Sequence, residues 1–373
     1  MKVLHLLDSV NRGGAETQVL DLCRNASRFG LEVTLVSAGG GVLENDFRDS
    51  GVEYVRLNRK LPVDIYFSSQ LRRIVKERNI QIVHGYQAVD GLHLYLATRR
   101  LASVKRVLSF QGFIPGQKNR ITAKLVAPRM HANISVSESL FTYLADIGIK
   151  RRANFHVVYN GADERRLKPG GGSIKRELGM PVTTILGGMV ANFVPDPTKD
   201  QLTICRAIPA VLEKFPDFHF VFAGRVADGA EGRMADCVDF CIGKGISDKV
   251  HFLGGRSDVA DILSELDLFV FSSRQEGFPV AVSEAMLAGV PLIVSDIEPL
   301  REAVRDGGFG QLFRTGDVDD LSRKIIGVLQ DTEQRESLAI AARGYALDHF
   351  SIDAHLRTLT SLYESLLKTP EGR

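Results

Sequence analysis

The sequence predicts an α/β protein with two doubly wound parallel sheets, each covered by helices on both faces. Three observations support this prediction. Short apolar runs alternate with helical patterns, the alternation restarts after a glycine-rich segment, and 373 residues are too many for one ordinary core. We therefore expect two domains of similar architecture.

The first half alternates seven apolar runs typical of strands with five periodic runs typical of helices. The predicted strands are Lys2–Leu7, Leu31–Ser37, Val52–Leu57, Ile80–His84, Val104–Phe110, Ala132–Val136 and Asn154–Tyr159. The predicted helices are Ala15–Phe29, Val63–Glu77, Gly91–Leu101, Ile121–Met130 and Glu138–Asp146. A turn at Asn160–Asp163 and a flexible joint at Pro169–Ser173 follow.

The same alternation returns after the glycine-rich joint. The predicted strands are Thr183–Val190, His219–Ala223, Val250–Leu253, Leu268–Phe271 and Leu292–Ser295. The predicted helices are Leu202–Phe215, Met234–Lys244, Val259–Glu265, Val282–Ala288 and Leu300–Arg305. Near the end, Ile352–Leu367 places leucines and a tyrosine on one helical face, which predicts an amphipathic helix.

Composition narrows the class of protein. Apolar residues make up 44% and charged residues 25%, as in soluble globular proteins. No run approaches the roughly 20 apolar residues of a membrane span, and we expect no secretory signal. Four separated cysteines do not suggest a disulfide framework, and Cys237 and Cys241 fit buried thiols better than metal ligands. A reducing cytoplasm is expected.

Charge is divided unevenly along the chain. Residues 1–169 contain 26 Lys and Arg against 15 Asp and Glu, whereas the remainder contains 21 against 30. Between Asp90 and Glu138 there is no acidic residue. This asymmetry fits an anionic membrane surface, a nucleic acid or a solvated face. No recognition motif accompanies the charge, so we expect no nucleic acid partner.

Two carboxylates flank a Gly-Phe-Pro turn near the C-terminal third. Glu276 lies on the loop after a buried strand, and Glu284 lies within the next helix. Ligands of open α/β sheets bind at the carboxyl ends of strands, where helix N-termini favour phosphate. Glu284 can accept from the vicinal hydroxyls of a ribose, and Glu276 can hold a second polyol beside the phosphates. A sugar nucleotide supplies all three parts.

These residues resemble the retaining glycosyltransferases of family 4, whose Glu-x7-Glu signature matches Glu276 and Glu284. Three segments carry the resemblance in order and in spacing: Ser272–Pro279, Glu284–Met286 and Ala288–Ile293. The resemblance implies the GT-B fold, with two Rossmann-like domains facing a cleft and a C-terminal helix that crosses back. The implied domains are residues 1–169 with a helix at about 350–368 on the acceptor side, and residues 173–349 for the donor nucleotide.

The resemblance also implies roles in the second domain. Glu276 is expected to bind the donor sugar and Lys199 its diphosphate, both as catalytic residues, while Glu284 holds the ribose. Asn192 stands where the family usually has an arginine, and Arg274 is a nearby replacement for the missing charge. The remaining donor-binding residues are Gly277, Phe278, Pro279, Val280 and, on the base side, Arg256.

Three loops of the first domain complete the implied site. Gly13, Gly14 and Glu16 match the Gly-Gly-x-Glu loop beside the diphosphate and acceptor, with Gly14 on the donor and Gly13 and Glu16 on the acceptor side. Gln111 occupies the catalytic position where many members have a histidine, which excludes imidazole chemistry there. His84 lies in another matching loop, where it is either an acceptor-side residue or a structural one.

These inferences predict a retaining hexosyltransferase that moves a hexose from a nucleoside diphosphate sugar, preferably a uridine one, to a glycan or lipid-linked acceptor. The alternatives are an epimerase for sugar nucleotides or a non-catalytic protein that binds sugar nucleotides or polysaccharide. We expect no cofactor and no metal, because the single Asp-x-Asp, Asp317 to Asp319, has the pattern of a helix start. The loss of a histidine at Gln111 argues against the acid–base pair of an epimerase.

The expected location is the cytoplasm, peripherally at the inner face of the membrane, in synthesis of cell-surface polysaccharide. Basic residues near an anionic bilayer contribute roughly 1 kcal/mol each. The acid-free stretch 91–137 carries eight of them, and Phe113, Ile114 and Leu125 interleave with these charges and are expected to enter the interface.

Overall fold

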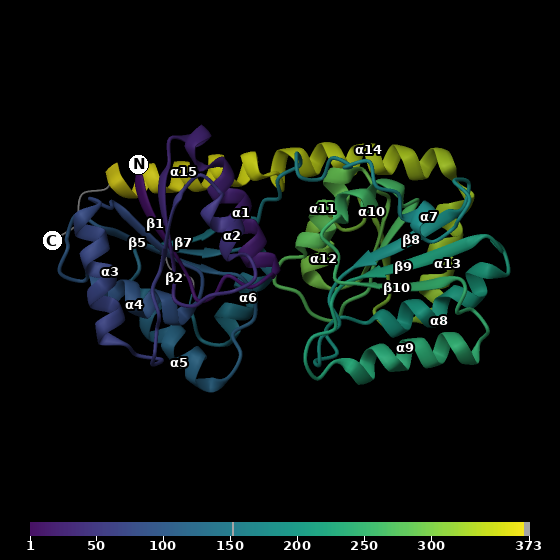
Figure 1. Cartoon of the computed structure of the whole chain (residues 1–373), viewed down its shortest axis with the longest axis horizontal. Helices are drawn as coiled ribbons and strands as arrows, with labels where there is room; N and C mark the ends of the chain where they lie inside the picture. Colours follow the sequence, from purple (N-terminus) through teal and green to yellow (C-terminus); the bar gives the residue numbers. More distant parts are fainter. Residues whose placement is uncertain (151–152, 369–373) are drawn as a thin grey trace. The chain divides into compact units, whose positions relative to one another are not determined.

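The computed structural model of the chain describes residues 1–150 and 153–368, which form two compact units (Figure 1). The first unit comprises Met1–Ala162 together with the segment that begins at Ile352, and the second comprises Asp163–Ser351. Each unit is a parallel sheet with helices on both faces. The predicted fold class is confirmed.

The sheet of the first unit has seven parallel strands among the described residues, in the order β3-β2-β1-β4-β5-β6-β7. The strands are β1 (Lys2–Leu7), β2 (Glu32–Ser37), β3 (Glu53–Arg56), β4 (Ile82–Gly85), β5 (Lys105–Phe110), β6 (Ala132–Ser135) and β7 (Phe155–Val157). The strand order reverses between β1 and β4. Ligands of such sheets bind at the carboxyl ends of the strands beside this reversal.

Helices cover both faces of this first sheet. They are α1 (Gly14–Asn25), the 3₁₀ turn η1 (Ala26–Phe29), α2 (Glu44–Arg48), α3 (Ile65–Glu77), α4 (Ala88–Thr98), α5 (Gln117–Val126), the 3₁₀ turn η2 (Ala127–Arg129), α6 (Glu138–Asp146) and α15 (Ile352–Lys368). Successive strand residues point to opposite faces. Accordingly, Val3 packs in the cluster that contains α1 and α15, and Leu4 packs in the cluster that contains α3 and α4.

The C-terminal helix α15 belongs to the first unit. Leu356, Leu359 and Tyr363 are fully buried in the same apolar cluster as residues of α1. His355 Nε2 lies 2.8 Å from the side-chain nitrogen of Gln18, and Asp353 pairs with Arg28 at 2.7 Å. The amphipathic pattern predicted this helix within one residue, because its buried face recurs at the helical period.

The second unit holds six parallel strands among the described residues, in the order β10-β9-β8-β11-β12-β13. The strands are β8 (Ile185–Val190), β9 (Phe218–Ala223), β10 (Val250–Gly254), β11 (Leu268–Phe271), β12 (Leu292–Ser295) and β13 (Gln311–Phe313). Here the order reverses between β8 and β11. The loops that follow these two strands contain Lys199 and Glu276 respectively.

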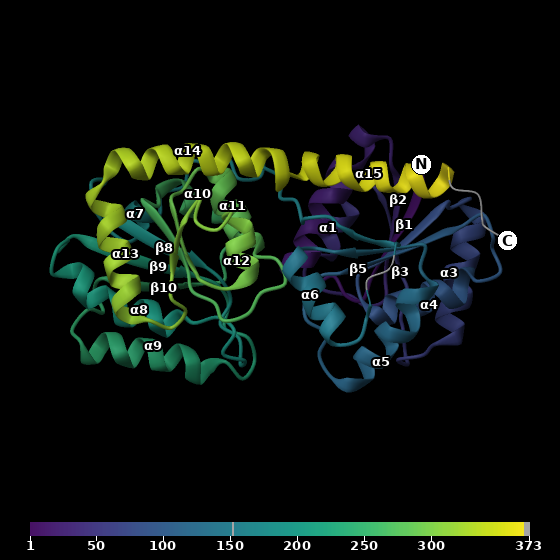
Figure 2. The same cartoon turned by 180° about the vertical axis from the view of Figure 1, so that it is seen from behind.

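Helices of the second unit pack in two layers. They are α7 (Ile174–Glu177), α8 (Gln201–Leu212), α9 (Glu231–Gly243), α10 (Val259–Glu265), α11 (Val280–Ala288), α12 (Glu298–Ala303), α13 (Val318–Gln330) and α14 (Thr332–His349). Helix α8 packs against α9 and α13, which Figure 2 shows from behind, and α11 packs against α10 and α14. The aspartate at the Asp-x-Asp start, Asp317, caps α13 as predicted.

Some elements were not predicted from the sequence. Helix α14 buries only Ala339, Ala342 and Ala346, so its apolar signal is weak. Strand β13 is a three-residue edge strand, too short for a periodic pattern. Several predicted strands were one to three residues too long, and α11 begins at Val280 rather than Val282.

The glycine-rich segment is not a free joint. The backbone N–H groups of Gly170 and Gly171 donate to Asp261 Oδ1 at 2.6 and 3.2 Å. A Cβ atom at Gly172 would lie 2.7 Å from Asp261 Oδ2, so glycine permits this close approach. The segment therefore lies within the second unit, and the units divide after Ala162 instead.

Within the described parts of the chain, no helix combines the length and apolar character needed to cross a bilayer.

Candidate active site

The loops after β8 and β11 contact each other at the carboxyl edge of the second sheet. Lys199 forms an isolated antiparallel bridge with Ser273, and the Arg274 N–H donates to the carbonyl of Thr198 at 2.7 Å. Both loops follow the strands beside the reversal in strand order. The fold thus fixes the backbone of the two loops against each other where open α/β sheets bind their ligands.

Glu276 is held by two side chains from these loops. Its Oε1 accepts a hydrogen bond from Ser273 Oγ at 2.8 Å and forms an ion pair with Lys199 Nζ. The ammonium also lies 4.8 Å from the centroid of the Phe271 ring. The side chain of Glu276 is 10% exposed and that of Lys199 is 21% exposed. A carboxylate and an ammonium are therefore fixed together at a partly accessible edge.

Glu284 lies in α11, directly after the Gly-Phe-Pro turn. Its Oε1 accepts from Arg166 Nη2 at 2.6 Å, and its side chain is 10% exposed. The sequence predicted Glu284 as a ribose ligand but gave no role to Arg166, which is 118 positions away. The pairing arises because the segment after Ala162 returns to the edge of the second sheet.

The side chains of Asn192 and Arg274 stabilise the loop after β8, and neither adds an unpaired positive charge beside it. Asn192 Oδ1 accepts from the N–H of Arg225 at 2.9 Å. Arg274 Nη2 donates to Asp200 Oδ2 at 2.8 Å, and Asp200 caps α8. Arg233 Nη2 donates to the carbonyl of Lys199 at 2.8 Å. The Arg274 pairing shows that this guanidinium neutralises a carboxylate, so it supplies less free charge than the sequence suggested.

Arg256, predicted on the base side, is engaged by two carboxylates. Its Nη1 donates to Glu177 at 2.8 Å and its Nη2 to Asp258 at 2.6 Å. Hydrogen bonds to Asp258 and then to Glu177 raise the pKa of the Arg256 guanidinium further above its usual value. These contacts fix the loop after β10, and a contact with the base is still a prediction.

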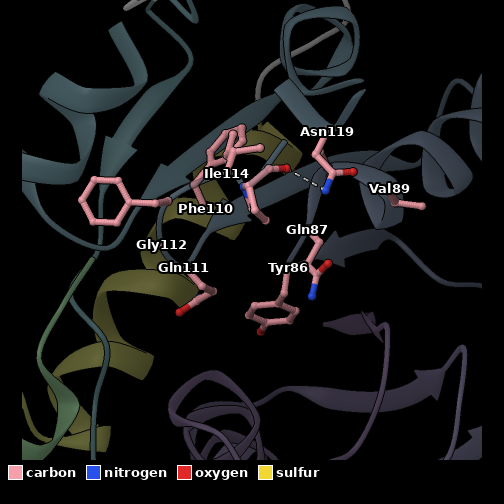
Figure 3. A pocket seen from close by; sticks show the side chains of 11 residues that line it. Tyr86, Gln87, Val89, Phe110, Gln111, Gly112, Ile114 and Asn119 are labelled. Atoms are coloured by element: carbon pink, nitrogen blue, oxygen red, sulfur yellow. Dashed lines mark hydrogen bonds between the residues drawn. The ribbon is translucent and has the colours of Figure 1, made fainter. Parts of the chain in front are cut away.

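A pocket of about 330 Å³ opens in the first unit, beside the ends of β4 and β5 (Figure 3). The residues that line it are all uncharged: Tyr86, Gln87, Ala88, Val89, Phe110, Gln111, Gly112, Phe113, Ile114, Pro115 and Asn119. Gln111 Oε1 accepts from Asn160 Nδ2 at 2.8 Å, which leaves the Nε2 group of Gln111 as a donor. Aromatic faces and amides are suited to sugar rings and their hydroxyls.

Two family models match the chain in the order of its two units. Residues 12–166 match the model described as Glycosyltransferase Family 4, and residues 173–345 match Glycosyl transferases group 1. The chain belongs to glycosyltransferase family 4. It is therefore a glycosyltransferase, as its two Rossmann-like units and its Glu-x7-Glu motif predicted.

Two relatives and a solved structure align along most of the chain. The N-acetyl-alpha-D-glucosaminyl L-malate synthase of Bacillus anthracis is 22% identical over 95% of this chain and 95% of its own length. An Escherichia coli protein, UDP-Gal:alpha-D-GlcNAc-diphosphoundecaprenol alpha-1,3-galactosyltransferase, is 25% identical over 89% and 87%. The Anabaena protein HepE, solved in complex with UDP, has a TM-score of 0.85 at 20% identity, over 98% of this chain and 100% of its own.

The structure favours the structural one of the two roles that the sequence left open for His84 of this glycosyltransferase. The ring is buried, with Nδ1 2.6 Å from Tyr363 Oη and Nε2 2.7 Å from Ser109 Oγ. The ring stacks against that of Tyr86, which is one of the residues that line the pocket. Burial, followed by the nearby His5 and His355, lowers its pKa well below the usual value. A neutral ring with both nitrogens engaged has no group left for an acceptor.

The Gly-Gly loop of this family 4 enzyme begins α1 at the carboxyl edge of the first sheet. A Cβ atom at Gly13 would lie 2.5 Å from Glu16 Oε2, so glycine lets that carboxylate fold back over the helix start. Burial, with a smaller contribution from Asp8, raises the pKa of Glu16. Gly14 is exposed as the first residue of α1. The roles predicted for these residues concern a bound substrate and are proposals.

Among residues 1–150 and 153–368, no group of three or more His, Cys, Asp or Glu side chains is arranged to hold a metal ion. All four cysteines are free and buried.

Proposed function

We propose that this glycosyltransferase moves a hexose, with retention of configuration, from a nucleoside diphosphate sugar to a glycan or lipid-linked acceptor in cell-surface polysaccharide synthesis. The observation that carries the proposal is the pairing of Glu276 with Lys199 at the carboxyl edge of β8 and β11. A carboxylate for sugar hydroxyls and an ammonium for phosphate stand side by side there. Glu284, on the helix that follows, adds a carboxylate for the ribose.

The proposed chemistry assigns one task to each charged group. The bond from the anomeric carbon to the diphosphate breaks while a bond to the acceptor oxygen forms on the same face of the sugar. The acceptor proton passes to the departing phosphate oxygen, and the proposed reaction has no covalent intermediate with the enzyme. Glu276 binds donor hydroxyls and stabilises the oxocarbenium-like transition state, and Lys199 stabilises the leaving diphosphate. One such preorganised contact typically contributes on the order of 10²–10³ in rate.

We favour uridine as the donor base. The Anabaena structure contains UDP, and the name of the Escherichia coli relative specifies a UDP-galactose donor with a diphosphoundecaprenol-linked acceptor. These facts concern those proteins, and they support the same class of donor and acceptor here. Catalysis is proposed to need no metal, with Lys199 and the start of α11 balancing the diphosphate charge. Full activity after treatment with EDTA is the expected result.

We propose that the first unit attaches peripherally to the inner face of an anionic membrane through α5. Ile121 and Leu125 are 49% and 56% exposed on this helix, and Lys118 and Lys124 are exposed on it as well. One predicted contact needs correction, since Ile114 is buried and lines the pocket. Phe113 is half-buried and packs edge-on against Tyr143, and its contact with the membrane stays a prediction.

A panel of uridine and guanosine diphosphate hexoses tests the proposed function. A bound donor at 100 times its dissociation constant stabilises the protein by about 2.7 kcal/mol, which identifies the donor by thermal shift. In the absence of an acceptor, we expect slow release of the nucleoside diphosphate from that donor. The donor sugar is not converted into another sugar. Conversion of the sugar on the intact nucleotide would indicate an epimerase, and binding without any turnover would indicate a binding protein.

A further inference from the structure

The carboxylate of Glu284 has a partner that comes from outside the motif. Arg166 Nη2 donates to Glu284 Oε1 at 2.6 Å, a distance typical of a charge-assisted hydrogen bond. The Glu284 side chain is 10% exposed and the Arg166 side chain 28% exposed, so water screens this pair weakly. The pair therefore fixes both the charge and the direction of the carboxylate.

The backbone that carries Arg166 is itself ordered by a turn. The Arg166 N–H donates to the carbonyl of Asp163 at 3.0 Å, and the side chain of Arg165 pairs with the carboxylate of Asp163 at 2.8 Å. Asp163 is the first residue of the second unit. Arg165 pairs with Asp163, two positions away, whereas Arg166 pairs with Glu284, which is 118 positions away. The contact between Arg166 and Glu284 therefore arises from the tertiary fold and not from proximity along the chain.

A carboxylate that binds vicinal hydroxyls must present its oxygens in a fixed plane. Without a cation, a nearly buried carboxylate is destabilised by desolvation, and it turns toward water. A guanidinium prevents this change, because it is permanently charged and its donors lie in a plane. An ammonium at the same place would keep the charge but not the planar donors.

We propose that Arg166 is a positioning residue that holds Glu284 ready for the ribose hydroxyls, so that selection of ribonucleotides over 2′-deoxyribonucleotides depends on it. The inference rests on the proposed nucleotide donor and deepens it. Arg166 acts on the sugar only through Glu284. Its loss weakens the hydroxyl contacts of the carboxylate and leaves the chemistry at Glu276 and Lys199 unchanged.

The test compares dissociation constants for UDP and 2′-deoxy-UDP, and for GDP and 2′-deoxy-GDP, on the full-length protein by calorimetry. A hydrogen bond to a charged group predicts a preference for the ribonucleotide of roughly tenfold or more in the natural protein. In Arg166→Gln the preference falls to within about threefold of unity, and Glu284→Gln gives the same result. Arg166→Lys restores part of the preference, since it keeps the charge.

Lys168→Gln is the matched control, because it removes one positive charge from an exposed side chain in the same segment. This variant keeps the natural preference. An unchanged preference in Arg166→Gln, or tighter binding of UDP by that variant, overturns the proposal. If Arg166→Gln does not fold, Arg166→Lys decides, and a preference equal to that of the natural protein overturns it.

The same measurements separate this inference from the proposed function. A natural protein that binds neither UDP nor GDP contradicts the proposed donor and, with it, the role of Arg166. A natural protein that prefers the ribonucleotide, with an Arg166→Gln variant that prefers it equally, contradicts only the role of Arg166.

Discussion

The two units present different chemistry at corresponding edges of their sheets. In the second unit, charged side chains meet in pairs, Lys199 with Glu276 and Arg166 with Glu284. In the first unit, the pocket is lined by uncharged aromatic and amide groups, and buried histidines lie beneath it. A diphosphate and its sugar need charged partners, whereas an acceptor ring is recognised by its shape and hydroxyls. In the proposed function the second unit binds the donor, and its charged residues give it the clearer signature in sequence.

The largest effect is expected from removing one charge of the donor half. Glu276→Gln should lower turnover of the identified donor by on the order of 10²–10³, because the transition state loses its carboxylate. Binding of the nucleoside diphosphate should change by less than about threefold. Steady-state release of nucleoside diphosphate and calorimetry measure the two quantities. Glu298→Gln, at an exposed position, is the control, and equal losses in both variants would contradict the account.

The buried histidines of the first unit predict that acid destabilises the protein. Burial is the main cause that lowers the pKa of His5 to about 3 and that of His355 to about 4, and it lowers the pKa of His84 as well. Since the unfolded chain binds these protons near pH 6.5, the stability that the neutral histidines contribute is fully present above pH 6.5 and is lost as the pH falls toward 4. Each histidine contributes roughly 1.4 kcal/mol per pH unit to the slope.

Urea unfolding at pH 7.5, 6 and 5 measures this slope. His84→Gln should lower stability at pH 7.5 and reduce the slope by about one proton. His349→Gln, at an exposed histidine of the second unit, is the matched control for the loss of an imidazole. A slope that His84→Gln does not alter would contradict a neutral, buried His84.

Asp90 predicts the opposite dependence above neutral pH. Burial of the carboxyl group, followed by the nearby charge of Asp8, raises the pKa of Asp90 to about 8. Because the folded protein holds this proton when the unfolded chain has lost it, the contribution of Asp90 to stability falls as the pH rises from about 4 to 8. Asp90→Asn should therefore flatten the dependence between pH 6.5 and 8, as measured by urea unfolding. A variant that keeps the natural slope in that range would show that Asp90 is ionised in the fold.

The smallest effect is expected from a nearly isosteric change in the uncharged pocket. Gln111→Glu keeps an acceptor for Asn160 but removes the Nε2 donor and adds a negative charge. Donor hydrolysis should fall by roughly five- to tenfold with unchanged nucleoside diphosphate binding, because a hydrogen bond is worth about 1 kcal/mol. Weaker nucleotide binding in this variant would show that Gln111 contacts the donor nucleotide instead.

The sequence predicted most of the fold because buried parallel strands and periodic helices leave strong local patterns. It also predicted the positions of Glu276 and Lys199 in strand-end loops, because the loops follow β11 and β8 directly. It missed Arg166, since the residue lies in a turn without a local signal and meets Glu284 only through the tertiary fold.

The sequence left the role of His84 open for a similar reason. The strand pattern indicated burial, but the groups that engage both ring nitrogens, Ser109 and Tyr363, come from β5 and from the C-terminal helix. Local patterns do not report partners that are 25 and 279 positions away. Likewise, the spacing of Ile114 among basic residues did not reveal that its side chain is buried and lines the pocket.

The most direct test of the central claim follows the sugar released when water replaces the acceptor. The natural protein and Glu276→Gln are incubated with the donor found by thermal shift, and the first-formed free hexose is observed by proton NMR before mutarotation. For an α-linked donor, the account predicts release of the α-anomer by the natural protein and a loss of on the order of 10²–10³ in the variant. Release of the β-anomer, or equal rates in the two proteins, would contradict it.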